Sequence, residues 1–489
     1  MTQIQGAIAA TRFGMGARPG EIAAASSDPR GWLKAQISSS AAVIPSDGLL
    51  SAKDVFKERQ EAFAMGPPGT AGTDQPTEAQ RAIRQQIQRE ARDGLQKEVA
   101  ARSQQAATTD KSFAERWLRF WANHFTVAAR NAQIIGLVGP FEREAIRPHV
   151  FDNFSTLLGN ASFHPGMLIY LDANRSIGPS TQAAKRRDAG LNENLAREIM
   201  ELHTMGVGSG YSQTDIIEFA KALTGWTVGG PQTARLAGAG LGGGRPGQGR
   251  NNRLGRAGIQ NVAEEMSAQA GSTVFAEGLH EPGARTVLGK KYGGPDKQQA
   301  AAILDDLAVH PATAHHIATK LVRHFVADQP PAGAVTKIET VFRKTNGNLA
   351  AVAKAVVDLD EAWAEQPQKF KSPEELLVSA ARATAPEAAF GRDSRQVYQS
   401  LAQQPFSAPS PAGWPDDTAS WSGADAIKKR LEWANAVSRR MSRGESPSDF
   451  LDRALGPIAG AKTRQAVARA ESAEQGFTLA LMSPEFQRR

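Results

Sequence analysis

The chain has 489 residues, of which 41% are hydrophobic and 22% charged, and it contains 46 Gly, 27 Pro and no Cys. A chain of this length can bury a core of ordinary size, so its folding requires neither disulfides nor a structural metal. The lack of Cys excludes disulfides, thiolate catalysis and Cys-ligated zinc or iron–sulfur sites. No stretch of about 18 apolar residues is present, so no transmembrane helix is expected.

The formal net charge is +7, and most of it comes from one segment. Residues 229–262 contain five Arg and no acidic or aromatic residue, and without these five Arg the net charge falls to +2. Nucleic-acid-binding surfaces combine basic side chains on a folded element with aromatic side chains that stack on bases. Nucleic acid is therefore not an expected partner.

Helical periodicity dominates the chain. Apolar side chains recur every four residues at Ile83, Ile87, Ala91, Leu95 and Val99, which is typical of one face of a long helix. Similar patterns predict helices over residues 113–125, 191–202, 214–223, 315–326, 335–342, 349–359, 374–383, 424–437 and 464–481. Alternating β-branched runs are almost missing, and a short hairpin is indicated only near 225–228 and 273–275.

The predicted fold is mainly α, with one large multi-helix domain over residues 1–489, long loop insertions and at most a minor hairpin. Residues 66–77 are rich in Pro and Gly and are expected to form a loop. Residues 229–272 are predicted to be a disordered insertion rich in Gly and Arg. Residues 405–423 form a Pro/Ser-rich loop with two Trp, so we expect this loop to fold against the body of the protein.

An aromatic stripe marks the helix predicted over residues 113–125. Phe113, Trp117, Trp121 and His124 fall on one side of this helix. A histidine in such surroundings is desolvated, which lowers its pKa and keeps it neutral. His124 is therefore either a core histidine or part of a site, and Arg116 beside the stripe is expected to pair with a buried acid.

The helix predicted over residues 191–202 carries two acids in different surroundings. Glu193, Arg197 and Glu201 are four residues apart and predict an ion-pair ladder on the outer side. Glu198 lies at the edge of the apolar stripe, with Asn194 beside it, and is expected to have the higher pKa. Two carboxyl groups in different environments suit acid/base chemistry, and they also occur in any helix with a polar border.

Four further features follow along the chain. Ser212 and Asp215 predict a capping box at the start of the helix over 214–223. Trp226 either lines a pocket or fills the core. His280 opens a compact polar turn, and His324 is expected at the surface or border of its helix.

Familiar catalytic signatures are missing from the sequence. It contains no G-x-S-x-G nucleophile elbow, no Walker A segment and no Rossmann glycine pattern after a strand. The function must therefore be inferred from the polar residues of the helices predicted over 113–125 and 191–202.

The chain resembles the family called domain of unknown function 1800. The resemblance covers nearly the whole chain and rests on specific motifs, which are residues 12–16, 120–125, 190–206, 211–215, 224–226, 280–283, 286–289, 320–325, 413–415 and Trp421.

The resemblance implies a mainly α-helical bacterial protein without a settled activity. It also implies a partner, because members are often exported and encoded beside a sulfatase-like family called domain of unknown function 1501. Residues 1–20 show no signal peptide, which departs from that pattern. Two locations stay open: the cytoplasm, or export together with a signal-bearing partner.

The residues favour a hydrolase that acts on a polymer such as a glycan. Glu198 is the candidate acid and Glu201 the candidate base, although Asp172 or Glu281 could supply the second carboxyl group. The candidate catalytic residues are Glu198, Glu201, His124, Arg116 and Asn194, and the candidate substrate-binding residues are Trp226, His280, Trp414 and Trp421.

Two alternatives remain beside the hydrolase. The first is a non-catalytic protein that binds the sulfatase-like partner, with His124, Arg116 and Glu198 as buried braces. The second is a metal protein that uses His124 with one or more of Glu198, Glu201 and His280. The spacing alone does not select a metal site, and the cofactor stays open.

Overall fold

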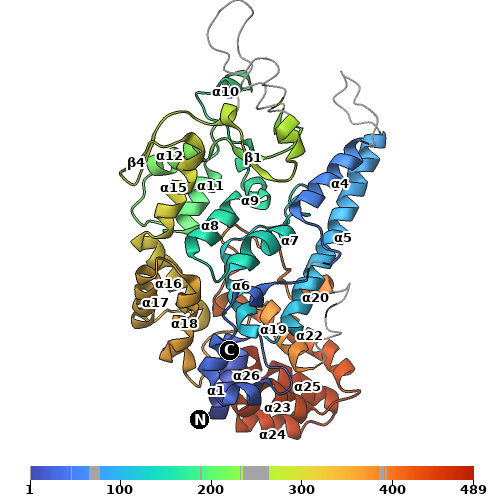
Figure 1. Ribbon diagram of the computed structural model, residues 1–489. Coiled ribbons are helices and arrows are strands. Elements are labelled where there is room, and N and C mark those ends of the chain that lie inside the picture. Colours follow the sequence, from blue (N-terminus) through green and yellow to red (C-terminus); the bar gives the residue numbers. More distant parts are fainter. Residues whose placement is uncertain are drawn as a thin grey trace, which may run out of the picture.

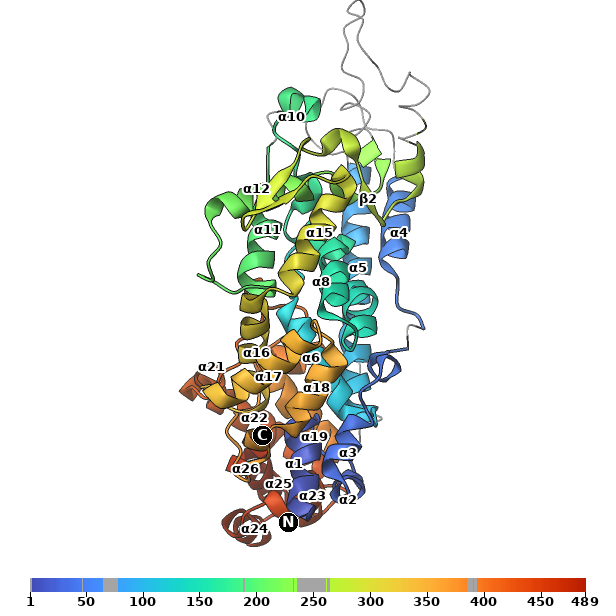
Figure 2. The same ribbon diagram turned by 60° about the vertical axis from the view of Figure 1, so that its left-hand side comes forward.

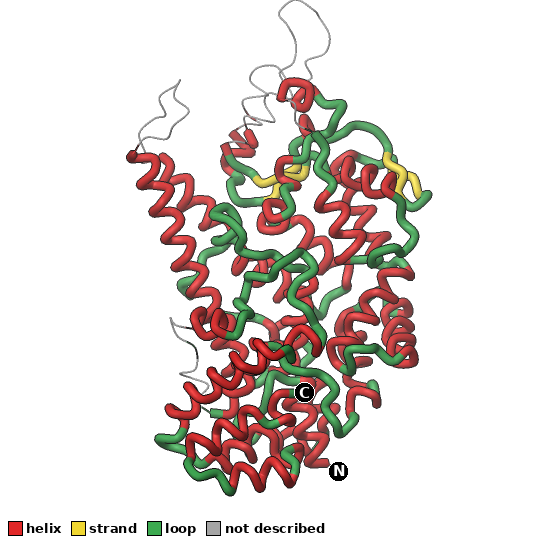
Figure 3. The backbone as a smooth tube through the Cα atoms, turned by 180° about the vertical axis from the view of Figure 1, so that it is seen from behind, coloured by secondary structure: helices red, strands yellow, loops and turns green. Residues whose placement is uncertain are grey.

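Helices make up most of the computed structural model, and short strands occur only near one end of its described part (Figure 3). The structure describes residues 2–45, 47–64, 78–187, 190–231, 233–234, 261, 264–384, 390 and 394–489. The predicted fold class, mainly α with a minor hairpin, is confirmed. No described helix is both long and apolar enough to cross a membrane.

The first third of the chain supplies the central helix and a long pair beside it. Helices α4 and α5 lie side by side at one edge of the elongated molecule, and α6 runs through its middle (Figures 1 and 2). The helices of this part are α1 (Thr2–Ile8), α2 (Glu21–Ser26), α3 (Pro29–Lys34), α4 (Ala52–Ala64), α5 (Glu78–Thr108) and α6 (Ser112–His124).

The middle of the chain forms the end of the molecule that carries the strands (Figure 1). Its elements are α7 (Val138–Phe141), α8 (Phe154–Phe163), α9 (Pro165–Tyr170), α10 (Gln182–Arg187), α11 (Asn194–Glu198), α12 (Gln213–Leu223), β1 (Trp226–Val228), β2 (Thr273–Phe275), β3 (Arg285–Val287), β4 (Lys290–Tyr292) and α15 (Asp296–Ala308).

The last part of the chain returns past α6 and forms the opposite end, where both termini lie (Figure 2). Its helices are α16 (Pro311–Phe325), α17 (Ala332–Lys344), α18 (Leu349–Asp358), α19 (Pro373–Ala383), α20 (Ser394–Ser400), α21 (Thr418–Trp421), α22 (Ala424–Met441), α23 (Pro447–Leu455), α24 (Ala461–Ala468), α25 (Ala473–Met482) and α26 (Pro484–Gln487). Short 3₁₀ turns cover Ser39–Ala42, Arg147–His149, Ala173–Arg175, Glu277–Leu279, Asp360–Trp363 and Gly456–Ile458, and π turns cover Ala9–Phe13, Glu142–Ile146 and Ile199–His203.

The aromatic stripe of α6 lies at the centre of the core, as its periodicity predicts. Phe113, Trp117 and Trp121 are fully buried, and the Trp117 indole donates a hydrogen bond to the Val150 carbonyl at 2.7 Å. One apolar cluster connects these side chains with residues as far apart in sequence as Ile8 and Phe486. The stripe therefore fixes α6 as the helix around which the other segments pack.

The two antiparallel hairpins differ in how well the sequence reveals them. The predicted hairpin is confirmed, because β1 pairs with β2 in the register Trp226–Phe275. The hairpin of β3 and β4 was not predicted, since its turn is Leu288-Gly289 rather than an Asn-Gly or Asp-Gly sequence. Both turn residues have positive φ, at 51° and 76°, which is the backbone of a type I′ turn.

The tertiary structure supports this unusual turn through α12. The predicted capping box of Ser212 and Asp215 is confirmed, and it uses one carboxylate oxygen of Asp215. The other oxygen accepts a hydrogen bond from the Leu288 backbone N–H at 2.7 Å. One side chain thus stabilises both a helix start and a hairpin turn.

Two predicted helices differ from those observed. The helix expected over 191–202 begins at Asn194 and changes to a π turn at Ile199–His203. The single helix expected over 464–481 is two helices, α24 and α25, because Ser472 caps α25 by accepting from the Gln475 N–H.

The three predicted loop segments have different outcomes. Residues 66–77 lie outside the described residues. The two ends of segment 229–272 are folded, since the Gly229 backbone pairs with Ala270 and Met266 is buried, whereas residues 235–260 between them lie outside the described part. The loop over 405–423 packs against the body as expected, with Trp421 buried.

Candidate functional site

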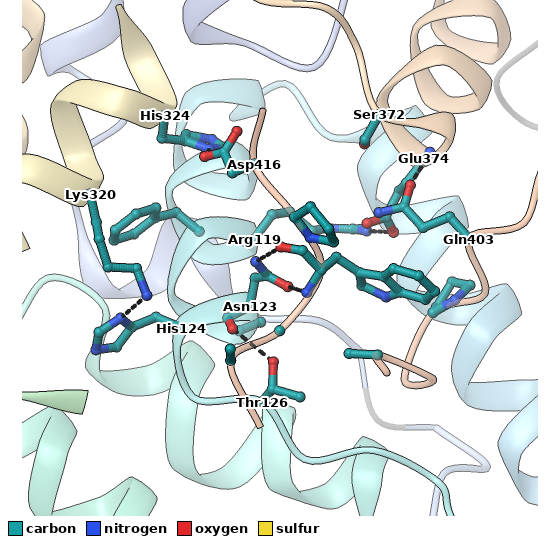
Figure 4. A pocket seen from close by; sticks show the side chains of 18 of the residues that line it. Arg119, Asn123, His124, Thr126, Lys320, His324, Ser372, Glu374, Gln403 and Asp416 are labelled. Atoms are coloured by element: carbon teal, nitrogen blue, oxygen red, sulfur yellow. Dashed lines mark hydrogen bonds and ion pairs between the residues drawn. The ribbon is translucent and has the colours of Figure 1, made fainter. Parts of the chain in front are cut away.

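A cavity of about 740 Å³ lies between α6, α16, α19 and the segment 403–417 (Figure 4). Both polar and aromatic side chains line it, and a cavity of this size matches the range of small-molecule sites. Its lining residues come from parts of the chain as far apart as Met15 and Trp421, so the complete fold is needed to form it.

Asn123 on α6 holds the segment 403–417 in place. Its side-chain amide donates to the Trp414 carbonyl at 2.9 Å, and its side-chain oxygen accepts from the Trp414 N–H at 2.7 Å (Figure 4). Further along, the Phe406 carbonyl accepts from the Ala129 N–H at 2.8 Å. The segment is therefore attached to α6 and its following loop at two points.

On the α19 side of the cavity, cations and anions are paired. Glu374 forms ion pairs with Arg102 and Arg119, and Glu375 pairs with Arg116. This confirms the expected buried acid for Arg116, whose Nε also donates to the Gly14 carbonyl at 2.6 Å. The positive charges on this side are thus already neutralised.

The opposite side of the cavity, formed by α6 and α16, has a different character. The Nζ of Lys320 donates a hydrogen bond to Nδ1 of His124 at 2.9 Å (Figure 4). The Nε2–H of His124 donates to the carbonyl of His203 at 3.0 Å, which leaves Nδ1 as the acceptor. Burial, together with Lys320 and its histidine neighbours, holds the pKa of His124 well below its usual value.

Two more neutral histidines surround this pair. Their rings lie with centroids 6.0 Å (His203) and 6.4 Å (His316) from the ring of His124. Burial and the Lys320 charge lower the pKa of His203 to about 3 and that of His316 to about 4. Neither ring therefore adds positive charge at neutral pH, and the ammonium of Lys320 is the main charge in this cluster.

Lys320 has no close counter-ion within the described part of the chain. None of the described carboxylates lies within ion-pair distance of its Nζ, and burial lowers its pKa to about 8 while Asp416 opposes that shift. Arg323, one helical turn further along α16, also lines the cavity and is exposed. Its guanidinium likewise forms no ion pair with the described acids.

His324 lies at the partly buried border of α16, one of the two positions expected from the sequence. Its Nδ1 donates to Asp416 at 2.7 Å (Figure 4). Burial lowers the pKa of His324. Asp416 arrives from the segment 403–417, and its presence makes the inward position of the imidazole favourable.

The predicted acids Glu198 and Glu201 are not among the residues that line the cavity. Glu198 is half-buried, and its pKa is raised by burial and by Glu201. Leu202, one turn further along, does line the cavity. Arg197 pairs with Glu201 at 3.5 Å, as the spacing predicts, and with Glu193 at 2.9 Å.

The other predicted residues fall into two groups. His124, Arg116, Trp414 and Trp421 line the cavity. Asn194 is exposed and borders a separate, shallow depression that also includes Asp172. Trp226 and His280 lie near the first hairpin, where Phe275 packs between their rings.

Glu281, considered as a second acid, is engaged in structure. Its carboxylate accepts from the Ser180 N–H at 2.7 Å and from the Ser180 hydroxyl at 2.6 Å. In the described ranges, no group of three or more His, Asp or Glu side chains is arranged so that it could hold a metal ion.

Sequence reasoning did not select Lys320, Arg323 or Asp416. A usable signal was present, because His316, Lys320, Arg323 and His324 share one face of α16 at helical spacing. This side of α16 borders a cavity only because α6 and the segment 403–417 enclose the space next to it. A local sequence pattern does not reveal that arrangement.

Comparison with known proteins identifies a family for the chain but no individual relative. No curated protein and no solved structure matches it. The family described as "Protein of unknown function (DUF1800)" matches residues 8–488, which is essentially the whole chain and agrees with the resemblance of its motifs. The chain therefore belongs to the DUF1800 family.

Proposed function

We propose that the protein binds a small organic anion in the cavity between α6, α16 and the segment 403–417. The observation that carries this proposal is the partly buried ammonium of Lys320, which lines the cavity and has a neutral imidazole, not a described carboxylate, as its hydrogen-bond partner. A buried cation without a counter-ion is costly, and a bound anion would remove that cost.

Two positive charges on α16 support an anionic ligand. Arg323 adds a second cation near the mouth of the cavity. Residues three apart on a helix are neighbours, with Cβ atoms about 5–6 Å apart, so Lys320 and Arg323 could hold one carboxylate or phosphate group together.

Aromatic side chains support an organic ligand over an inorganic ion. Phe120, Phe406, Trp414 and Trp421 all line the same cavity. Ring systems pack favourably against such side chains, so a ligand with an apolar or ring-shaped body and one anionic group fits the lining.

Binding of benzoate and phenyl phosphate, measured by titration calorimetry, tests the proposal. Lys320→Met should weaken binding by about 10- to 100-fold, the loss expected for a charge-assisted hydrogen bond. Lys337→Met is the matched control, because Lys337 is exposed on α17 and pairs with Glu361. Equal affinity of the wild type and Lys320→Met for both probes would contradict the proposal.

Binding should also depend on pH in a defined direction. The pKa of Lys320 is about 8, so the ammonium is present below that pH and is lost as pH rises through it. Benzoate affinity should therefore be nearly constant at pH 6–7 and fall above pH 8, and the Lys320→Met variant should lack this fall.

Carboxylate acid/base hydrolysis remains a second candidate function. Glu198 favours it, because this half-buried acid has a raised pKa and lies one turn before Leu202 in the cavity lining. Glu198→Gln should abolish turnover or binding of a polymer at an unchanged melting temperature. A large loss of stability without a specific functional change would instead identify Glu198 as a residue that only braces the fold.

The sulfatase-like partner stays a prediction from the family resemblance.

A further inference from the structure

We propose that Lys320 forms an imine with carbonyl compounds that carry an anionic group, such as aromatic or aliphatic oxo acids. This inference rests on the proposed anion site and adds a covalent step to it. The observation behind it is an amine that lines a cavity, is fixed by a neutral imidazole and is not held by a described carboxylate.

The hydrogen bond to His124 determines how the amine is presented. Nδ1 of His124 must be an acceptor, since its Nε2–H is used by the His203 carbonyl. Nζ therefore donates one N–H to His124, and a neutral amine would keep its lone pair free for another atom. Phe120 stacks against the imidazole with 6.2 Å between ring centroids, which restricts the imidazole's movement.

Protonation favours this reaction near neutral pH. An ordinary lysine is almost entirely an ammonium ion at pH 7–8. Burial lowers the pKa of Lys320 to about 8, so a substantial part of the molecules carries the nucleophilic amine under these conditions. Lysines in desolvated pockets are activated as nucleophiles in this way.

The reaction needs no group beyond the amine, the carbonyl compound and water. The lone pair of Nζ attacks the carbonyl carbon, the C=O electron pair moves to oxygen, and a proton passes from nitrogen to that oxygen to give a carbinolamine. The hydroxyl group then leaves as water together with the remaining proton of the amine, and the nitrogen lone pair forms the C=N bond. The overall change is amine plus carbonyl to imine plus water.

Arg323 explains why the carbonyl compound should be anionic. It lies one turn from Lys320 on the same helix and lines the same cavity. A carboxylate held by Arg323 would place a carbonyl group of the same molecule near Nζ, and holding two reactants together greatly raises their effective concentration.

Trapping with 4-carboxybenzaldehyde and sodium cyanoborohydride tests the inference on the full chain. The reductant delivers hydride to the protonated imine and gives a stable secondary amine, which intact-mass measurement and peptide mapping locate. At pH 7–8 we expect Lys320 to react roughly 10- to 100-fold faster than exposed lysines such as Lys337, because its larger amine fraction outweighs the lower nucleophilicity of a less basic amine. Neutral benzaldehyde should react at least about tenfold more slowly at Lys320.

Labelling and benzoate binding, both measured on the wild type, separate the two proposals. The adduct should map to Lys320 and disappear in Lys320→Arg, which removes the amine, whereas benzoate binding by the wild type reports on the anion site alone. Labelling spread evenly over exposed lysines in a wild-type protein that binds benzoate would overturn the imine inference and leave the anion site standing. If the wild type neither binds benzoate nor is labelled at Lys320, both the anion site and the imine inference are overturned. If benzaldehyde labels Lys320 as fast as 4-carboxybenzaldehyde does, the expectation of an anionic substrate is overturned.

The pH profile of labelling provides a check that needs no variant. With sodium borohydride in place of cyanoborohydride, which also reduces the unprotonated imine, the rate at Lys320 should rise to a plateau above about pH 8, whereas the rate at exposed lysines should continue to rise toward pH 10. A single profile shared by Lys320 and Lys337 would contradict an activated amine.

Discussion

At the scale of single residues, the cavity and the buried wall behind His124 contain side chains whose placement reduces stability. Lys320 is enclosed with a neutral histidine as its hydrogen-bond partner, and the ring nitrogens of His203 have no partner among the described residues. Buried polar groups of this kind are usually paired, and exceptions concentrate where a protein binds or reacts. This is why Lys320, rather than the well-paired Arg116, is the best indication of a site.

Lys320→Met should therefore stabilise the protein while it weakens anion binding. Below pH 8 the folded wild type contains a charged, partly buried ammonium, and its removal should raise the free energy of unfolding by about 1–3 kcal/mol. This difference in unfolding free energy between Lys320→Met and the wild type should shrink as pH rises from about 8 toward 10. In that range the folded wild type holds a neutral amine and no longer carries the cost of a buried charge, while its unfolded state is still protonated.

Urea unfolding of the wild type and Lys320→Met at pH 7 and pH 9.5 measures this effect. Lys337→Met, an exposed substitution, should change stability by less than about 0.5 kcal/mol at both pH values. Destabilisation by Lys320→Met at pH 7 would show that the lysine contributes to packing more than its charge costs.

At the scale of elements, the cavity depends on how the segment 403–417 is attached to α6. Asn123 makes both hydrogen bonds to the Trp414 backbone, and Gly413 beside it has φ 87° and a backbone so close to Asn123 that a Cβ would lie 2.4 Å from its carbonyl oxygen. Ala402 and Phe406 also have positive φ, at 61° and 59°. A backbone in this conformation is held by its contacts, because non-glycine residues disfavour it.

Asn123→Ala should release this segment without unfolding the core. Loss of two hydrogen bonds to backbone groups should lower stability by about 1–3 kcal/mol, and cleavage within residues 405–417 should become faster. Limited proteolysis with peptide mapping measures this. Asn160→Ala is the control, since Asn160 is exposed on α8 and, among the residues that the structure describes, its side chain donates only to the Thr156 carbonyl. Unchanged cleavage in Asn123→Ala would mean that other contacts hold the segment.

At the scale of the whole molecule, a buried ionic network joins segments that are distant in sequence. Glu115 of α6 accepts from Arg119 at 2.9 Å and from Arg147 at 3.0 Å, and Glu142 accepts from Arg102 of α5 at 2.7 Å. Burial alone would raise the pKa of Glu142, but its arginine partners lower it to about 2. The network thus connects α5, α6 and the π turn at Glu142–Ile146, and three of its members, Arg102, Arg119 and Glu142, line the cavity.

Glu115→Gln should destabilise the whole fold by about 3–5 kcal/mol, because it leaves arginines buried without their counter-ion. The wild type should also lose stability in acid. A carboxylate with a lowered pKa, such as that of Glu142, stabilises the fold above about pH 4.3, which is the pKa of Glu in an unfolded chain. This stabilisation is lost as the pH falls toward 2. Melting curves between pH 7 and pH 3 measure both effects.

Glu432→Gln is the control for this network. Glu432 is exposed and pairs with Lys428 at 3.6 Å, so its loss should cost less than about 1 kcal/mol. Equal effects of the two substitutions at pH 7 would show that the buried network contributes little to folding.

The sequence by itself determined the local features of this protein. Most of the helical periods, the stripe on α6, the capping box at Ser212 and the ladder at Arg197 depend on residues within a turn or two of each other, and the structure confirms them. The family could also be identified from the sequence, because its motifs are short and ordered along the chain.

Only the tertiary structure decided where a site could be. Lys320 and His124 are 196 positions apart, and Asp416 reaches His324 from 92 positions away, yet each pair shares a hydrogen bond. The charge of a buried lysine, and whether a histidine faces a cavity or the core, depend on burial and on neighbours from other segments. Periodicity contains no information about such neighbours, since it describes one helix at a time, and the cavity exists only where several helices and the segment 403–417 meet.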